Sequence, residues 1–196
     1  MKIIPRLQSL LLPIGAGSLA LVLGLLGWKR DVLKINVRSC GLPWSFRFQV
    51  RWYFSAARDF LAAAFNCPGP PIHVRPRDLG KLEYLKREPT LFLTAHFHNW
   101  ERLAAWMSSQ GIPLLGAARA LSSPVFDRLL TWVRARYGIP VVTRDVLSGA
   151  RAHLRKGGCF GVLWDQHSPL SRRASPFFGM PVAMEPLPEI LLRRYR

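Results

Sequence analysis

Acidic residues are scarce in this chain of 196 residues, which holds eleven Asp and Glu against 28 Lys and Arg, for a net charge of +17. The basic excess is spread over the whole chain, so it is not a charged tail. A surface this basic favours an anionic partner, which can be a nucleic acid, an anionic lipid or an acidic protein. The mean hydropathy of +0.11 and the lack of any helix-turn-helix, zinc or RNP pattern favour a membrane surface over a nucleic acid as the partner.

Cysteine is also scarce, and internal repeats, linkers and low-complexity segments are absent. Cys40, Cys67 and Cys159 are odd in number, far apart and in no CxxC spacing. This pattern excludes a disulfide framework and a zinc ribbon, and it fits a reduced cytosolic setting. Because 49% of the residues are hydrophobic and 11% are aromatic, the chain is not intrinsically disordered or collagen-like. Its length predicts one domain with an appendage.

The appendage is an uncharged apolar segment, Leu7–Trp28. About 20 apolar residues let a helix cross ~30 Å of hydrocarbon, so the segment predicts a membrane anchor over residues 1–28. Pro13 and the glycines also fit an interfacial helix, and a signal peptide is the third interpretation, although the basic residues that follow oppose cleavage. The larger basic cluster lies after the segment, so residues 29–196 are expected on the cytoplasmic side of the membrane.

Short apolar segments alternate with amphipathic ones after the anchor. The predicted strands are 90–95, 114–118, 139–143 and 159–164, and the predicted helices are 45–65, 78–87, 100–110, 124–137 and 146–156. This alternation predicts an α/β domain with a mostly parallel sheet flanked by helices. Ligands bind such sheets at the carboxyl ends of the strands. The residues expected at those ends include His96, Arg119, Arg144 and Asp165.

His96 and Glu101 lie at the first of these strand ends. A carboxylate in the first turn of the next helix can hold one imidazole nitrogen protonated, which leaves the other nitrogen as a general base for a hydroxyl. The spacing alone leaves two other interpretations open. In the first, His96 is a buried histidine with satisfied hydrogen bonds, and Glu101 favours the helix N-terminus. The second is a zinc site, whose ligands would be His96, His98, Asp165 and His167.

The block His96-Phe97-x-Asn99-Trp100-Glu101 resembles the HFGNWE block of the lipid A late acyltransferases, which are lauroyl and myristoyl transferases of the glycerolipid acyltransferase H-x4-D/E superfamily. Five more segments are similar to family blocks and follow in the family's order: 28–37, 118–130, 134–139, 154–166 and 175–183. The last of them is similar to the family's PFFGxPA loop. The chain differs from the family at His98, where Gly is usual, and at Ala120 and Ser123, where Pro and Asn are common.

The resemblance implies a glycerolipid-acyltransferase-like sheet with an acyltransferase domain at 29–196, which is short or truncated at its C-terminus compared with the family. It implies transfer of a fatty acyl chain to a hydroxyl of a lipid A precursor at the cytoplasmic face of the bacterial inner membrane. The donor would be acyl carrier protein or acyl-CoA, and neither a metal nor an organic cofactor would be needed. His96 would be the general base and Glu101 the residue that orients it.

Four further residues complete the expected site. Arg119 is the expected cation for an oxyanion or a substrate phosphate, with a solvated surface charge as its alternative. Asp165 is expected to pair with Arg119 or Arg144, or to cap a turn. Asn99 is expected to cap the helix that carries Glu101.

Two other functions stay open on the sequence alone. One is acylation of a different membrane lipid, such as a lysophospholipid or another glycolipid. The other is lipid binding by a catalytically degenerate, membrane-anchored member of the family. The aromatic residues of 45–65 fit either core packing or an acyl groove.

Overall fold

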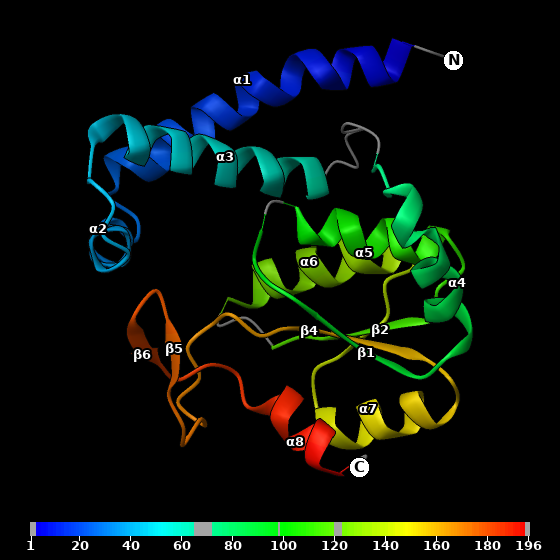
Figure 1. Cartoon of the computed structure of the whole chain (residues 1–196). Helices are drawn as coiled ribbons and strands as arrows, with labels where there is room; N and C mark the ends of the chain where they lie inside the picture. Colours follow the sequence, from blue (N-terminus) through cyan, green and yellow to red (C-terminus); the bar gives the residue numbers. More distant parts are fainter. Residues whose placement is uncertain (1–2, 65–71, 98, 120–122, 195–196) are drawn as a thin grey trace. The chain divides into compact units, whose positions relative to one another are not determined.

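The computed structural model describes residues 3–64, 72–97, 99–119 and 123–194 (Figure 1). The chain divides into two compact units. The first unit comprises Met1–Pro70 and Ser175–Val182, and the second unit comprises Pro71–Ala174 and Ala183–Arg196. All the residues predicted for the site belong to the second unit.

The second unit is built on a four-stranded sheet in which every pair of neighbouring strands is parallel. The strands are β1 (Thr90–Thr94), β2 (Leu114–Ala117), β3 (Val141–Val142) and β4 (Cys159–Leu163), and their order across the sheet is β1-β4-β2-β3. The prediction of a parallel α/β domain is therefore confirmed. Only β3 is much shorter than predicted, since Pro140 has no N–H to donate to a strand ladder.

Helices cover both faces of this sheet (Figure 1). On one face lie α4 (Leu79–Arg87), which follows the 3-10 turn Pro76–Asp78, α5 (Trp100–Ser109) and α6 (Pro124–Arg136). On the other face lie α7 (Val146–Arg155) and α8 (Leu187–Arg194). Apart from α8, which the sequence analysis missed, these helices begin and end within two residues of their predicted bounds.

Alternation along the strands supplies both layers of the core, because successive side chains of a strand point to opposite faces. In β4, Cys159 packs with Met107 and Ile112 on the α4–α5 side. The next residue, Phe160, packs with Leu154 and Leu191 on the α7–α8 side. The apolar run in β4 is therefore buried on both faces, as expected for a central parallel strand.

Cys159 offers a direct check of this core. Its side chain is fully buried, and burial raises the pKa of the thiol to about 11. At pH 8 only about one thiol in a thousand would then be in the reactive thiolate form. We expect iodoacetamide to modify the half-buried Cys40 at pH 8 in the folded protein and to modify Cys159 only after unfolding; mass spectrometry of a Cys67→Ser variant distinguishes the two sites. Rapid alkylation of Cys159 in the folded chain would contradict the packing described here.

The first unit holds three helices and a two-stranded hairpin. The helices are α1 (Ile3–Leu25), α2 (Arg30–Ser39) and α3 (Phe46–Ala64), and the hairpin pairs β5 (Ser175–Phe177) with β6 (Met180–Val182) in antiparallel register. Helices α1 and α3 lie side by side with opposite directions (Figure 1). The Tyr53 hydroxyl, which is buried in α3, donates a hydrogen bond to the carbonyl oxygen of Trp28 at 2.7 Å. This bond ties α3 to the turn after α1. Neither α2 nor the hairpin was predicted from the sequence.

The apolar N-terminal segment forms a helix that keeps several side chains exposed, among them Leu21, Val22 and Leu25. Within the described residues, no helix taken alone has the length and apolar character to cross a membrane. The segments Leu11–Leu25 and Arg30–Ser39 meet these criteria as a pair, with a bend of 91° between them. The spanning anchor over residues 1–28 therefore stays a prediction.

Candidate active site

His96 and Asp165 meet where two neighbouring parallel strands end. The β1–β4 register continues to the pair Thr94 and Leu163, so both chains leave the sheet at the same edge. One carboxylate oxygen of Asp165, Oδ2, accepts a hydrogen bond from the backbone N–H of His96 at 2.9 Å. The other, Oδ1, lies 2.7 Å from the imidazole Nδ1. A single carboxylate therefore fixes both the backbone and the ring of His96.

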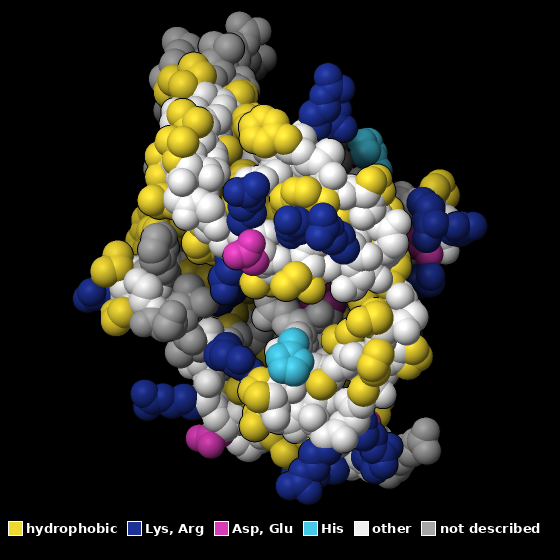
Figure 2. All heavy atoms as spheres, turned by 90° about the vertical axis from the view of Figure 1, so that its left-hand side faces the viewer, with side chains coloured by type: hydrophobic (Ala, Val, Ile, Leu, Met, Phe, Trp, Pro, Cys, Tyr) yellow, Lys and Arg dark blue, Asp and Glu magenta, His cyan; other side chains and the backbone are white. Residues whose placement is uncertain are grey.

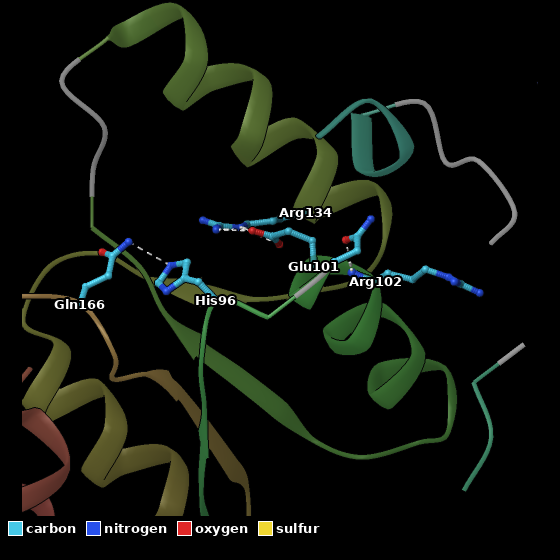
Figure 3. Close-up of polar contacts among 6 residues, drawn as sticks. His96, Glu101, Arg102, Arg134 and Gln166 are labelled. Carbon is cyan, nitrogen blue, oxygen red and sulfur yellow. Dashed lines mark hydrogen bonds and ion pairs between the residues drawn. The ribbon is translucent and has the colours of Figure 1, made fainter. Parts of the chain in front are cut away.

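This contact sets the tautomer of the imidazole. A carboxylate can only accept, so Nδ1 carries a hydrogen, and in the neutral ring Nε2 then has the lone pair. The side-chain amide nitrogen of Gln166 lies 3.2 Å from Nε2 and is the natural donor to that lone pair (Figure 3). On another side, the His96 ring meets the Trp100 ring edge to face, with 4.6 Å between the ring centroids. The ring is held at three points, and among the described residues the group hydrogen-bonded to Nε2 is the exposed amide of Gln166.

Glu101 lies in the same region but has a different partner. Its carboxylate accepts hydrogen bonds from the guanidinium of Arg134 in α6, with Nε 3.0 Å from Oε1 and 3.1 Å from Oε2 (Figure 3). A third contact joins Arg134 Nη2 to Oε1. The side chain of Glu101 is 10% exposed and that of Arg134 is 15% exposed. This buried ion pair links α5 to α6.

The structure thus differs from the sequence prediction that Glu101 orients His96. Among the described residues, no hydrogen bond or ion pair joins these two side chains; the imidazole contacts Asp165 instead. The cause lies in the turn between β1 and α5. Asn99 caps α5, as predicted, by accepting from the backbone N–H of Arg102 at 2.9 Å. Glu101 is then in the first turn of α5, with its carboxylate against Arg134 of α6.

Arg119 and Arg144, the two arginines that the sequence suggested as partners of Asp165, do not pair with it, because its carboxylate faces His96. Arg119 follows β2, its side chain is 69% exposed, and its guanidinium lies 4.0 Å from the carboxylate of Glu185. Arg144 follows β3 at the edge of the sheet and is exposed. Both lie at the carboxyl ends of their strands, as the sequence predicts, and remain at the surface there.

The part of the chain that the structure describes holds no cluster of side chains that would support the zinc interpretation. Within those residues, no group of three His, Cys, Asp or Glu side chains is placed to hold a metal ion. His98, which the zinc interpretation needs, lies outside the described residues, as does Ala120. His167 belongs to an isolated antiparallel bridge with Met184.

An apolar pocket of about 70 Å³ adjoins the ion pair. Its walls come from the α5–α6 side of the sheet and from the two helices, and Glu101 and Arg134 supply its charged groups. The Trp100 side chain also lines the pocket, and its ring contacts the imidazole of His96. The pocket and the imidazole are therefore neighbours on either side of Trp100. The remaining lining residues are Phe92, Thr94, Leu103, Ala104, Met107, Leu114, Gly116, Ala117, Ile139, Val141, Gly161, Val162 and Leu163.

Two of these roles were not found from the sequence. Arg134 lies within one of the segments that resemble a family block, but its partner is 33 residues away and on another helix. Asp165 was selected as a site residue, yet its pairing with His96 depends on β4 being inserted between β1 and β2. Knowing that β1 and β4 are neighbours in the sheet would have been enough to predict the contact between His96 and Asp165.

In chemical terms, the site offers an imidazole that is oriented by a carboxylate and lies beside an apolar pocket. A family model described as bacterial lipid A biosynthesis acyltransferase matches residues 72–196, which is well over half of the chain. The match begins almost where the second unit begins, and it contains the whole site. No curated protein sequence matches the chain significantly.

Proposed function

Because the chain belongs to the bacterial lipid A biosynthesis acyltransferase family and is an acyltransferase, we propose that His96 and Asp165 together activate the acceptor hydroxyl. The observation that carries the proposal is the 2.7 Å contact between Asp165 Oδ1 and His96 Nδ1, which leaves Nε2 as the base. Glu101, the residue that the H-x4-E spacing suggests as the orienter, serves in this account to hold Arg134 and the pocket wall.

The proposed reaction needs only proton transfer and a thioester. Nε2 of His96 removes the proton from the acceptor hydroxyl as its oxygen attacks the thioester carbonyl carbon of the donor. The carboxylate of Asp165 stabilises the imidazolium that forms. The tetrahedral intermediate then collapses, the carbon–sulfur bond breaks, and the imidazolium returns the proton to the leaving thiolate. The products are the acyl ester and the free thiol.

Gln166 occupies the position that the acceptor hydroxyl would take. Its amide nitrogen lies 3.2 Å from Nε2, and a hydroxyl that gives its proton to Nε2 must replace it there. We therefore expect Gln166→Ala to change the catalytic rate by less than about tenfold, because a hydrogen bond of this kind contributes about 1 kcal/mol. Steady-state kinetics against wild type and His96→Ala provides the comparison. A loss as large as that of His96→Ala would mean that Gln166 takes part in the chemistry.

The pocket beside Trp100 is proposed to take part of the acyl chain. Its lining is almost wholly aliphatic and aromatic, which suits a hydrocarbon tail.

Arg119 and Arg144 are proposed to bind phosphates of the donor or acceptor, since both are exposed cations at strand ends where ligands of parallel sheets bind. Asn99 is proposed to position the turn between His96 and Glu101 through its cap.

The acceptor is proposed to be a lipid A precursor, and the donor acyl carrier protein or acyl-CoA. The net charge of +17 suits both an acidic carrier protein and a phosphorylated acceptor. The site would work at the cytoplasmic face of the bacterial inner membrane, with residues 1–28 as the anchor.

The function is tested by incubating the purified protein with acyl carrier protein that carries a radiolabelled acyl chain, together with a lipid A precursor. Thin-layer chromatography should reveal an acylated lipid A precursor that is absent with His96→Ala. Transfer only to a lysophospholipid or another glycolipid offered in parallel would redirect the acceptor. Binding of the lipid without transfer to any of these acceptors would favour the catalytically degenerate alternative.

A further inference from the structure

The β5–β6 hairpin carries a group of exposed apolar side chains that the acyl-transfer site does not use. Residues 172–181 are all exposed, and this stretch includes every residue of the hairpin except Val182, which is half-buried. At its tip, Phe177 is 45% exposed, Phe178 66% and Met180 47%, and the two phenylalanine rings meet edge to face. Large apolar side chains gathered at a protruding tip are unusual on a surface that faces only water.

Phe178 lies in the turn of the hairpin, at a backbone conformation that bulky residues rarely adopt. The register pairs Phe177 with Met180, so Phe178 and Gly179 form a two-residue turn, and their φ angles are +50° and +76°. Two positive φ values are typical of a type I′ turn, where Asn-Gly is the preferred sequence. A bulky side chain at the first of these positions is a conformational outlier, and such outliers cluster at functional sites. The tip keeps a phenylalanine where an asparagine would be less strained.

The hairpin is also suited to an environment poor in water. Pro176 and Pro181 face each other across the two strands, and neither has an N–H group. Two of the six strand residues therefore have no backbone donor that would need a partner away from water. The same prolines prevent another strand from pairing along these positions, so addition of a peptide strand does not explain the exposed tip.

The charge around the hairpin is complementary to an anionic surface. The first unit holds nine Lys and Arg against two Asp, and no acidic residue occurs between Gln166 and Met184. Arg172 and Arg173 come just before β5 in the chain and are exposed. On the face drawn in Figure 2, Lys and Arg side chains lie among hydrophobic ones and acidic side chains are few. Basic residues beside exposed aromatic residues are the combination that binds anionic lipid surfaces.

We infer that the tip of the β5–β6 hairpin, formed by Phe177, Phe178 and Met180, inserts into the headgroup region of an anionic phospholipid bilayer. The inserted part is a second point of membrane contact, separate in sequence from the apolar N-terminal helix. This inference does not depend on the acyl-transfer reaction.

Spin labelling in vesicles tests the insertion directly. The full chain with Cys40→Ser and Cys67→Ser retains only the buried Cys159, and a nitroxide is attached through Phe178→Cys or, in a second protein, Met180→Cys. Lys156→Cys, at the exposed end of α7, is the matched control. Each protein is reconstituted into vesicles of phosphatidylethanolamine and phosphatidylglycerol, and collisions with oxygen and with a water-soluble nickel chelate are measured by electron paramagnetic resonance.

The expected result is a severalfold higher oxygen-to-nickel collision ratio at residues 178 and 180 than at residue 156. Adding Phe178→Asn to the Met180→Cys protein should lower the ratio at residue 180 towards that of the control, because asparagine suits the turn and lacks the apolar ring. Ratios at 178 and 180 equal to that of the control would overturn the inference. So would labels that leave water only after acyl-CoA is added, because the tip would then cover a substrate. An unchanged ratio at 180 in the Phe178→Asn protein would remove Phe178 from the inserted group.

Discussion

Replacing His96 with alanine is expected to lower acyl transfer by about 10²–10⁴-fold, because the acceptor hydroxyl loses the base that removes its proton. The imidazole is partly exposed, and its hydrogen bonds join it to the side chains of Asp165 and Gln166. The backbone N–H of His96 also donates to Asp165, and this bond remains in His96→Ala. Loss of the imidazole should therefore leave the thermal unfolding temperature close to that of wild type. Kinetics with the labelled donor and a thermal melt of the same preparation check both parts.

The Asp165→Asn variant tests the role of Asp165 as the hydrogen-bond partner of His96. Asparagine keeps the size of the side chain, but its amide can donate to Nδ1 and favour the tautomer in which Nε2 carries the hydrogen. Loss of the correct tautomer in a Ser-His-Asp triad costs about 10⁴-fold in rate, so a fall of several orders of magnitude is expected here. The double variant with His96→Ala should be little slower than His96→Ala alone, since residues that act as a unit are not additive. Additive losses would contradict a joint role for the two residues.

The second large effect is on stability. Glu101→Ala leaves the buried guanidinium of Arg134 without its carboxylate, and breaking a buried pair in this way costs about 3–5 kcal/mol in the free energy of unfolding. For a chain of this size the melting temperature should fall by roughly 10 °C. Differential scanning calorimetry of wild type and variant measures the fall.

Replacing both members of the pair separates stability from chemistry. Glu101→Leu combined with Arg134→Met fills the space with apolar groups and leaves no unpaired charge, so most of the lost stability should return. If Glu101 acts mainly by holding α5 against α6, some acyl transfer should return with it. A double variant as unstable as Glu101→Ala would contradict the structural role of the pair. Full stability with activity as low as that of His96→Ala would assign the pair a direct role in the reaction.

The fold of the second unit could be predicted from the sequence because its signals are local. Apolar runs such as that of β4 and the amphipathic pattern of α7 depend on nearest neighbours along the chain, and the cap at Asn99 depends on three residues. The hairpin was missed since its strands have three residues each and contain Pro176 and Pro181, which conceal the alternation expected of strands. Helix α2 was missed because its basic residues were interpreted as the charged cluster after the anchor and as part of a family-like segment, and their helical periodicity was not considered.

The site was predictable in its residues but not in its pairs. His96, Glu101 and Asp165 were identified as polar groups at strand ends or in the turn that follows. Which carboxylate contacts the imidazole depends on strand order, and the insertion of β4 beside β1 is a tertiary result that spacing does not encode. A Glu five residues after a His suggests a local pair, whereas the nearest carboxylate to this imidazole comes from 69 residues along the chain.

The most direct measurement is the rate of acyl transfer from labelled donor to lipid acceptor by Asp165→Asn, compared with the Glu101→Leu/Arg134→Met protein under the same conditions. We expect the Asp165→Asn protein to be well folded and slower than wild type by several orders of magnitude, and we expect the double variant to keep more activity than Asp165→Asn. A well-folded Asp165→Asn protein that transfers acyl groups at the wild-type rate would contradict the central role given to the His96–Asp165 pair.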